Sequence, residues 1–113
     1  MRVAPTGETI SLTTTRETYM LIVSGRLHVA ATARDDFLTG CREVVTHART
    51  APGCLDFALS PDPLDPTRIN VYERWESDEA LTAFRDSGPA PDQLVAIVDA
   101  DVQKYRISAT EPA

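Results

Sequence analysis

The sequence has few of the features that mark nucleic-acid-binding, membrane or secreted proteins. Its 113 residues carry a formal net charge of −6 and contain no run of basic residues. Nucleic acid and anionic membrane surfaces attract basic proteins, so we expect neither as a partner. No apolar run approaches the length of a spanning helix, and the first residues lack the basic-then-apolar pattern of a secretion signal. These absences predict a cytoplasmic protein.

Motifs for metals and nucleotide cofactors are also missing. The chain has two cysteines, Cys41 and Cys54, which are too few for a disulfide framework or a cysteine metal site. It has no Cys-x-x-Cys pair, no two-histidine zinc signature and no glycine-rich phosphate loop. We therefore expect no metal, and we expect both thiols to be reduced and mostly buried.

The chain does have enough apolar material for one folded domain. Hydrophobic residues make up 42% of it, and its length is close to the commonest domain size. Residues 1–17 are polar, with Pro5 and Gly7 as breakers, and are predicted to form a flexible N-terminal arm. Residues 18–110 are predicted to form the domain.

Periodic patterns within this domain give the element order β-α-β-β-α-β. The strand and helix patterns cover residues 19–29, 32–50, 54–60, 70–76, 77–87 and 99–110, with one more short helix beginning at Pro91. Thr32 and Asp35 form a capping box at the start of the first helix, and Ser77 is expected to cap the second. The first helix carries an apolar stripe of Phe37, Leu38, Cys41, Val44, Val45 and Ala48.

Alternation assigns side chains to faces in the two middle strands. On the strand predicted for residues 54–60, we expect Leu55, Phe57 and Leu59 to share one face. In the second, one face has Val71, Glu73 and Trp75, and the other has Tyr72, Arg74 and Glu76.

This order indicates an α+β, ferredoxin-like antiparallel sheet with both helices on one face. The first strand, residues 19–29, is apolar on both of its faces, so one apolar set is left without helices to cover it. A second copy of the chain would cover that set. We therefore expect a homodimer through the sheet faces, which is a dimeric α+β barrel.

Trp75 is the single tryptophan and stands where a strand turns directly into a helix. An indole in this position can form one wall of a flat apolar pocket, with part of the ring open to a ligand. It can equally be a fully packed core residue. Our hypothesis is that Trp75 forms the wall of a pocket.

The segment Tyr72-Glu73-Arg74-Trp75-Glu76-Ser77-Asp78-Glu79-Ala80-Leu81, together with the helix end Ala51-Pro52-Gly53-Cys54-Leu55, resembles the antibiotic biosynthesis monooxygenase family. The resemblance extends over roughly residues 19–108. It implies a sheet-to-sheet homodimer with a pocket between sheet and helices, and oxygenation of quinols, anthrone-like polyketides or haem, often without metal or flavin. Many members have histidine where this chain has Phe84, and the asparagine of haem-degrading members is missing near Gly25. Haem is therefore disfavoured, and no cofactor is expected.

Cofactor-independent oxygenation needs a base, a dry site and flat walls for an electron-rich phenol or quinol. The candidate walls are Trp75, Tyr72, Phe57 and Phe84; the candidate proton acceptors are His47, His28 and Glu73; the candidate cations are Arg26, Arg74 and Arg85. The simpler interpretation of each charged candidate is an ion-paired or solvated surface group without a role in a site. The alternative function is a non-catalytic barrel that binds or senses a small aromatic molecule.

Overall fold

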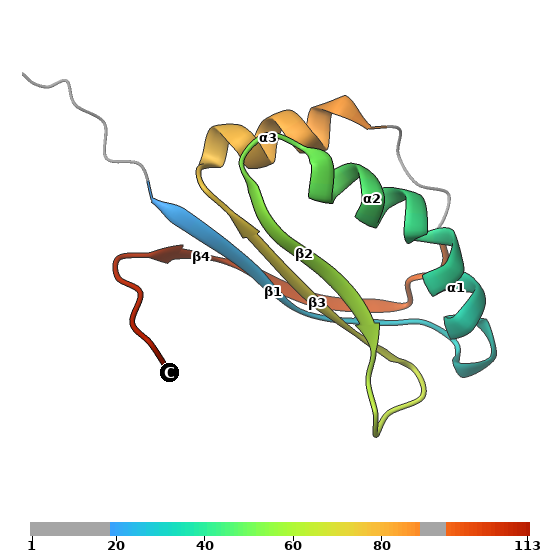
Figure 1. Ribbon diagram of the computed structural model, residues 1–113. Helices are drawn as coiled ribbons and strands as arrows, with labels where there is room; N and C mark the ends of the chain where they lie inside the picture. Colours follow the sequence, from blue (N-terminus) through green and yellow to red (C-terminus); the bar gives the residue numbers. More distant parts are fainter. Residues whose placement is uncertain (1–18, 89–94) are drawn as a thin grey trace, which may run out of the picture.

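Four strands form one antiparallel sheet in the computed structural model, which describes residues 19–88 and 95–113 (Figure 1). The strand order is β2-β3-β1-β4, and every neighbouring pair is antiparallel. The strands are β1 (Met20–His28), β2 (Cys54–Pro61), β3 (Arg68–Trp75) and β4 (Asp99–Ile107). The predicted ferredoxin-like α+β class is confirmed. The predicted arm and the predicted helix start at Pro91 lie outside the described residues.

The helices lie on one face of the sheet, as predicted (Figure 1). They are the short 3-10 helix η2 (Ala31–Ala33), α1 (Arg34–Gly40), α2 (Arg42–Thr50) and α3 (Asp78–Ser87). We call the sheet side beneath them the helix face; it includes Leu21, Val23, Phe57, Val71, Glu73 and Trp75. The opposite side is the open face; it includes Met20, Ile22, Arg26, Tyr72, Arg74 and Tyr105. Among the described residues, nothing from the same chain forms a second layer over the open face.

The predicted 32–50 helix exists, but its start differs from the prediction. Thr32 lies inside η2, and the residue that precedes α1 is Ala33, which makes no side-chain capping bond. The capping box was therefore wrong, because a tight 3-10 turn takes up the residues that would have formed it. A break at Cys41, directly after the weak helix former Gly40, separates α1 from α2. The apolar stripe still faces the sheet, with Phe37, Cys41 and Ala48 buried.

The predicted cap of α3 is confirmed. The Ser77 hydroxyl oxygen accepts a hydrogen bond from the backbone N–H of Ala80 at 3.1 Å. Asp78 follows in the first turn, where a negative charge favours the helix dipole. It also accepts hydrogen bonds from Lys104 and Arg106 on β4, which joins the start of α3 to the edge of the sheet.

The face assignment in β2 was partly wrong. An irregularity in the β2–β3 pairing lies between Cys54 and Asp56, so Leu55 has no partner on β3. Such a bulge shifts the alternation by one residue. Cys54 therefore packs against the core beside Trp75, while Leu55 is exposed. Phe57 keeps its predicted helix-face position.

No helix in the two described ranges is long and apolar enough to span a membrane. The cytoplasmic location stays a prediction. Cys41 and Cys54 are both free thiols, buried and half-buried respectively, as expected.

Candidate functional site

Glu73 is a carboxylate on an otherwise largely apolar part of the helix face. It lies in the middle of β3, opposite Val23 on one side and Phe57 on the other. Burial raises the pKa of the Glu73 carboxyl above its usual range. A hydrogen bond from Trp75 and the positive charge of Arg85 oppose this rise in the pKa without cancelling it. A carboxylate with a raised pKa is a stronger base than an ordinary surface glutamate.

Trp75 holds the Glu73 carboxylate in place through a hydrogen bond. Its indole Nε1–H donates a hydrogen bond to Glu73 Oε1 at 2.9 Å. The side chain is 0% exposed, so the expectation that a ligand could reach part of the indole is contradicted in this structure. The packing of Phe84 and Leu81 from α3 onto the end of β3 is the physical reason. Trp75 is a core residue whose polar edge orients Glu73.

Phe84 joins the aromatic residues of the site. Its ring centroid lies 5.1 Å from that of Trp75, 5.9 Å from that of Phe57 and 5.3 Å from the His47 ring. These are normal spacings for offset and edge-on aromatic pairs. Three of the predicted site residues, Phe84, Phe57 and His47, are thus brought together from α3, β2 and α2. Together with Trp75 they form a continuous aromatic cluster beside Glu73.

His47 stands at the exposed end of this aromatic cluster. Its Nε2 lies 3.0 Å from the Ser87 hydroxyl oxygen at the end of α3. The Phe84 ring lies between it and the buried Trp75, and among the described residues His47 pairs with Ser87 whereas Glu73 pairs with Trp75. Two of the predicted proton acceptors therefore lie in the same region of the helix face but at different depths.

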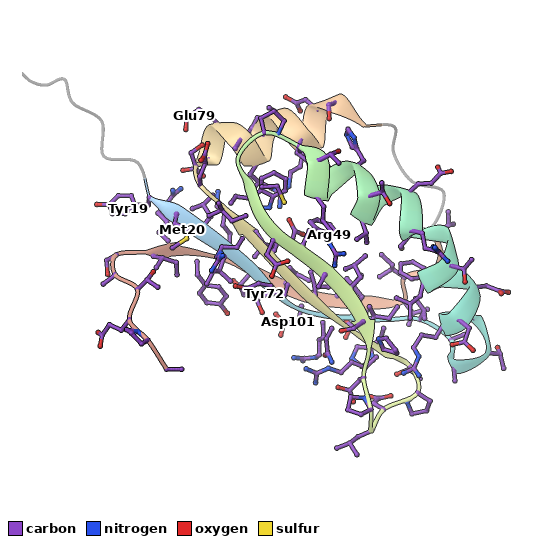
Figure 2. All side chains as sticks on the ribbon, viewed as in Figure 1. Tyr19, Met20, Arg49, Tyr72, Glu79 and Asp101 are labelled. Carbon is purple, nitrogen blue, oxygen red and sulfur yellow. The ribbon has the colours of Figure 1, made fainter. Side chains whose placement is uncertain are left out.

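Arg49 takes part in positioning the aromatic cluster, although no sequence motif singles it out. Its Nε donates to the backbone carbonyl of Phe57 at 2.8 Å, which ties the last turn of α2 to β2. Figure 2 shows Arg49 between α2 and the sheet, with Tyr72 and Asp101 on the other side of the sheet. Arginine near the end of a helix was the only available signal, and it is too common to be specific.

Three other predicted residues do not join this site. Tyr72, Arg26 and Arg74 lie on the open face, because they alternate with the helix-face residues of their strands. Arg26 forms an ion pair with Asp101 at 3.4 Å. The buried Nε of Arg74 has no hydrogen-bond partner among the described residues. Tyr72 therefore does not share one pocket with the other predicted walls, Trp75, Phe57 and Phe84, in a single chain, and Arg26 does not reach it.

His28 behaves as a strand-end histidine rather than a member of the site. Its Nδ1 lies 2.9 Å from the hydroxyl oxygen of Thr67, in the loop that precedes β3. Within the described ranges, no group of three His, Cys, Asp or Glu side chains could hold a metal ion. Burial raises the pKa of the Cys41 and Cys54 thiols, which makes them poor nucleophiles.

The arrangement as a whole is a ferredoxin-like α+β domain with one orientated carboxylate among aromatic rings. The sequence profile of the antibiotic biosynthesis monooxygenase family matches residues 20–96. The chain therefore belongs to that family, which confirms the resemblance seen in the sequence. A comparison with curated proteins found no match.

Solved structures with the same fold come from several bacteria. A protein from Deinococcus radiodurans, provisionally named an antibiotic biosynthesis monooxygenase, is 18% identical with a TM-score of 0.71, covering 82% of this chain and 97% of that one. A protein from Chloroflexus aurantiacus with the same provisional name is 22% identical with a TM-score of 0.66, covering 82% and 97%. A Bacteroides thetaiotaomicron protein described as a possible oxidoreductase is 14% identical with a TM-score of 0.71, covering 80% and 100%. These similarities support the fold.

Proposed function

We propose that the protein is a small cofactor-independent monooxygenase that acts on an aromatic phenol, quinol or related polyketide. The observation that carries this proposal is Glu73, a half-buried carboxylate with a raised pKa that is hydrogen-bonded to the Trp75 indole and lies opposite Phe57 on β2. An orientated base in a poorly hydrated aromatic setting is the main requirement for activating such a substrate toward oxygen.

In the proposed reaction, Glu73 removes a proton from an acidic phenol or from an activated ring carbon. The resulting anion supplies the electrons that reduce O2 and forms a hydroperoxide at carbon, to which Glu73 returns the proton. The hydroperoxide then loses water to leave a carbonyl. One oxygen atom enters the product, and the other leaves as water with two hydrogens of the substrate. The substrate is the only reductant.

The surrounding residues have separate roles in this proposal. Phe84, which is partly buried, lies against the flat substrate, and Phe57, which is 4% exposed, packs behind it and limits hydration of the anion. Trp75 keeps the Glu73 carboxylate in one orientation through its Nε1–H. Arg85 favours negative charge near Glu73 and stabilises the substrate oxyanion. His47 is a second proton acceptor at the exposed rim.

The same proposal includes a homodimer formed through the open face. One half of that face is apolar, with Met20 opposite Ile107 and Ile22 opposite Tyr105, whose side chain is half-exposed. The other half carries ion pairs such as that of Arg26. Burial of the apolar half against a second copy would remove it from water and could provide an acceptor for the orphan Arg74 Nε.

The alternative is a dimeric barrel that binds or senses a small aromatic molecule without oxidising it. One observation favours it: Phe84 stands where many family members have a histidine, so α3 contributes no second base to the site.

Oxygen uptake separates the two functions. The wild type, Glu73→Gln and Glu76→Gln are compared on a panel of quinols and anthrones; Glu76 is an exposed carboxylate at the same strand end and serves as the matched control. We expect Glu73→Gln to lower kcat by about 10²- to 10⁴-fold, the usual contribution of a general base, and Glu76→Gln to leave it unchanged. Tight binding with uptake no faster than autoxidation would instead establish the binding module.

A further inference from the structure

Both histidines contact a hydroxyl whose hydrogen is already used elsewhere. The Ser87 hydroxyl donates to the backbone carbonyl oxygen of Phe84 at 2.8 Å, and the same oxygen lies 3.0 Å from His47 Nε2. A hydroxyl has one hydrogen to donate and lone pairs to accept with. Since a carbonyl oxygen can only accept, the Ser87 hydrogen belongs to that bond, and Ser87 must accept from His47.

We infer that Ser87 is a positioning residue that holds neutral His47 in its Nε2–H tautomer and leaves Nδ1 as the free proton acceptor of the ring. In neutral imidazole one nitrogen donates and the other accepts, and the partner of one nitrogen decides the state of the other. The opposite tautomer would place the Nε2 lone pair against an oxygen whose hydrogen points to Phe84. To bond to that lone pair, the Ser87 hydroxyl would have to donate its hydrogen to Nε2 and lose its hydrogen bond to the Phe84 carbonyl oxygen.

The contact also determines where the ring lies. His47 belongs to α2 and Ser87 is the last residue of α3, so their bond joins the two helices at the exposed end of the aromatic cluster. The His47 ring lies against Phe84 at a tilt of 35°, which restricts its plane. The use of Nδ1 as a proton acceptor in turnover rests on the proposed function; the tautomer itself does not.

His28 provides an internal control with the opposite arrangement. The Thr67 hydroxyl donates to Asp65 Oδ1 at 2.8 Å and lies 2.9 Å from His28 Nδ1. By the same reasoning, His28 Nδ1 must donate, and its free lone pair is on Nε2. The chain has two histidines. When both imidazole rings are neutral, one spectrum should therefore show one ring in each tautomer.

The test is long-range proton–nitrogen NMR of the imidazole rings, at a pH where both are neutral. The variants are Ser87→Ala, Ser87→Thr and Thr46→Ala, which removes a neighbouring α2 hydroxyl that bonds to Arg42 instead of to His47. We expect opposite tautomers for His47 and His28 in the wild type. In Ser87→Ala the two nitrogen shifts of His47 should move toward each other as the tautomers interconvert. Ser87→Thr should restore the wild-type shifts, and Thr46→Ala should not change them.

Oxygen uptake by the same variants tests the catalytic part. We expect Ser87→Ala to lower kcat by about two- to tenfold, the range set by losing one hydrogen bond, with recovery in Ser87→Thr. His47→Gln keeps a donor for Ser87 but has no basic nitrogen in place of Nδ1, and it should lower kcat at least as much. An Nδ1–H ring at His47, or shifts that ignore Ser87→Ala, would overturn the inference whatever the activity. Normal turnover in Ser87→Ala with scrambled tautomers would overturn the catalytic part, whereas an inactive wild type would contradict only the proposed function.

Discussion

The helix face and the open face are two sides of the same four strands, and they differ in how polar groups are held. On the helix face, Glu73 is half-buried and orientated by Trp75, with hydrophobic neighbours on the adjoining strands. On the open face, Arg26 pairs with Asp101 where both side chains keep about half of their exposure. A charge that is poorly hydrated and held in one orientation can be used in chemistry, whereas an exposed pair is screened by water.

The two faces also differ in whether a single chain covers their apolar side chains. The helix face is closed by α2 and α3, and its aromatic cluster is complete within the described residues. On the open face, no other part of the chain that the structure describes covers Met20, Ile22 and Tyr105. The aromatic cluster of the helix face therefore needs no second copy, whereas the apolar half of the open face does.

The largest effect is expected from Trp75. Trp75→Ala would remove a fully buried indole and the donor to Glu73, and we expect the free energy of unfolding to fall by about 3–5 kcal/mol. Trp75→Phe keeps a ring and should cost about 1–3 kcal/mol. Leu64→Ala, at a position 92% exposed in the β2–β3 loop, is the control and should change the value by less than about 0.5 kcal/mol. Chemical denaturation measures all three. An unchanged stability of Trp75→Ala would mean that the indole is not packed as described.

Alternation in β3 predicted this part of the site well. Val71, Glu73 and Trp75 share one face because a strand has a period of two, and Ser77 caps α3 because its hydroxyl can reach the backbone of Ala80. The same alternation already separated Tyr72 from Trp75. Placing both in one pocket was an error of interpretation, and the sequence pattern itself was correct.

Other features depend on contacts that no local pattern reports. The bulge at Leu55 turns Cys54 toward Trp75, and this follows from how β2 pairs with β3. The start of α1 is decided by the 3-10 turn after β1, not by the Thr32 hydroxyl. Full burial of Trp75 depends on the distance between α3 and the sheet. That distance is a tertiary quantity, which strand and helix periods do not contain.

The next largest effect concerns the open face. Ile22→Glu would place a charge from each subunit in the apolar half of the proposed interface, and we expect the dimer Kd to rise on the order of 100-fold, with the fold retained. Its neighbour Val23 points to the helix face and is 3% exposed, so Val23→Glu should unfold the chain instead. Sedimentation and circular dichroism distinguish these results. A wild type that is monomeric at high concentration would remove the interface from the proposal.

A smaller effect is expected in the pH dependence of stability. Burial raises the folded-state pKa of Glu73 above its ordinary value of 4.5. Between these two values the folded chain binds more protons than the unfolded chain, so the contribution of Glu73 to stability falls as the pH rises through this window. Glu73→Gln cannot titrate, and its stability relative to the wild type should therefore increase above pH 4.5 and level off above the folded pKa. Denaturation curves from pH 4 to pH 8 measure the difference. A difference that shrinks with rising pH would show that the carboxylate is favoured, not penalised, by its surroundings.

The smallest effect comes from two arginines that the sequence could not rank. Arg85 lowers the pKa of Glu73 through its charge, so Arg85→Ala should raise the pKa of Glu73 further and move the acid limb of the rate profile to higher pH. Because Arg85 is exposed, the accompanying loss in kcat/KM should be only about two- to fivefold. Arg26→Ala removes an exposed cation on the other side of the sheet, where it pairs with Asp101, and should change neither the profile nor KM. The measurement is the pH dependence of kcat/KM and of KM for both variants, with the same quinol as substrate. If Arg26→Ala changed KM as much as Arg85→Ala did, the substrate would have to reach the open face, and the assignment of the site to the helix face would be wrong.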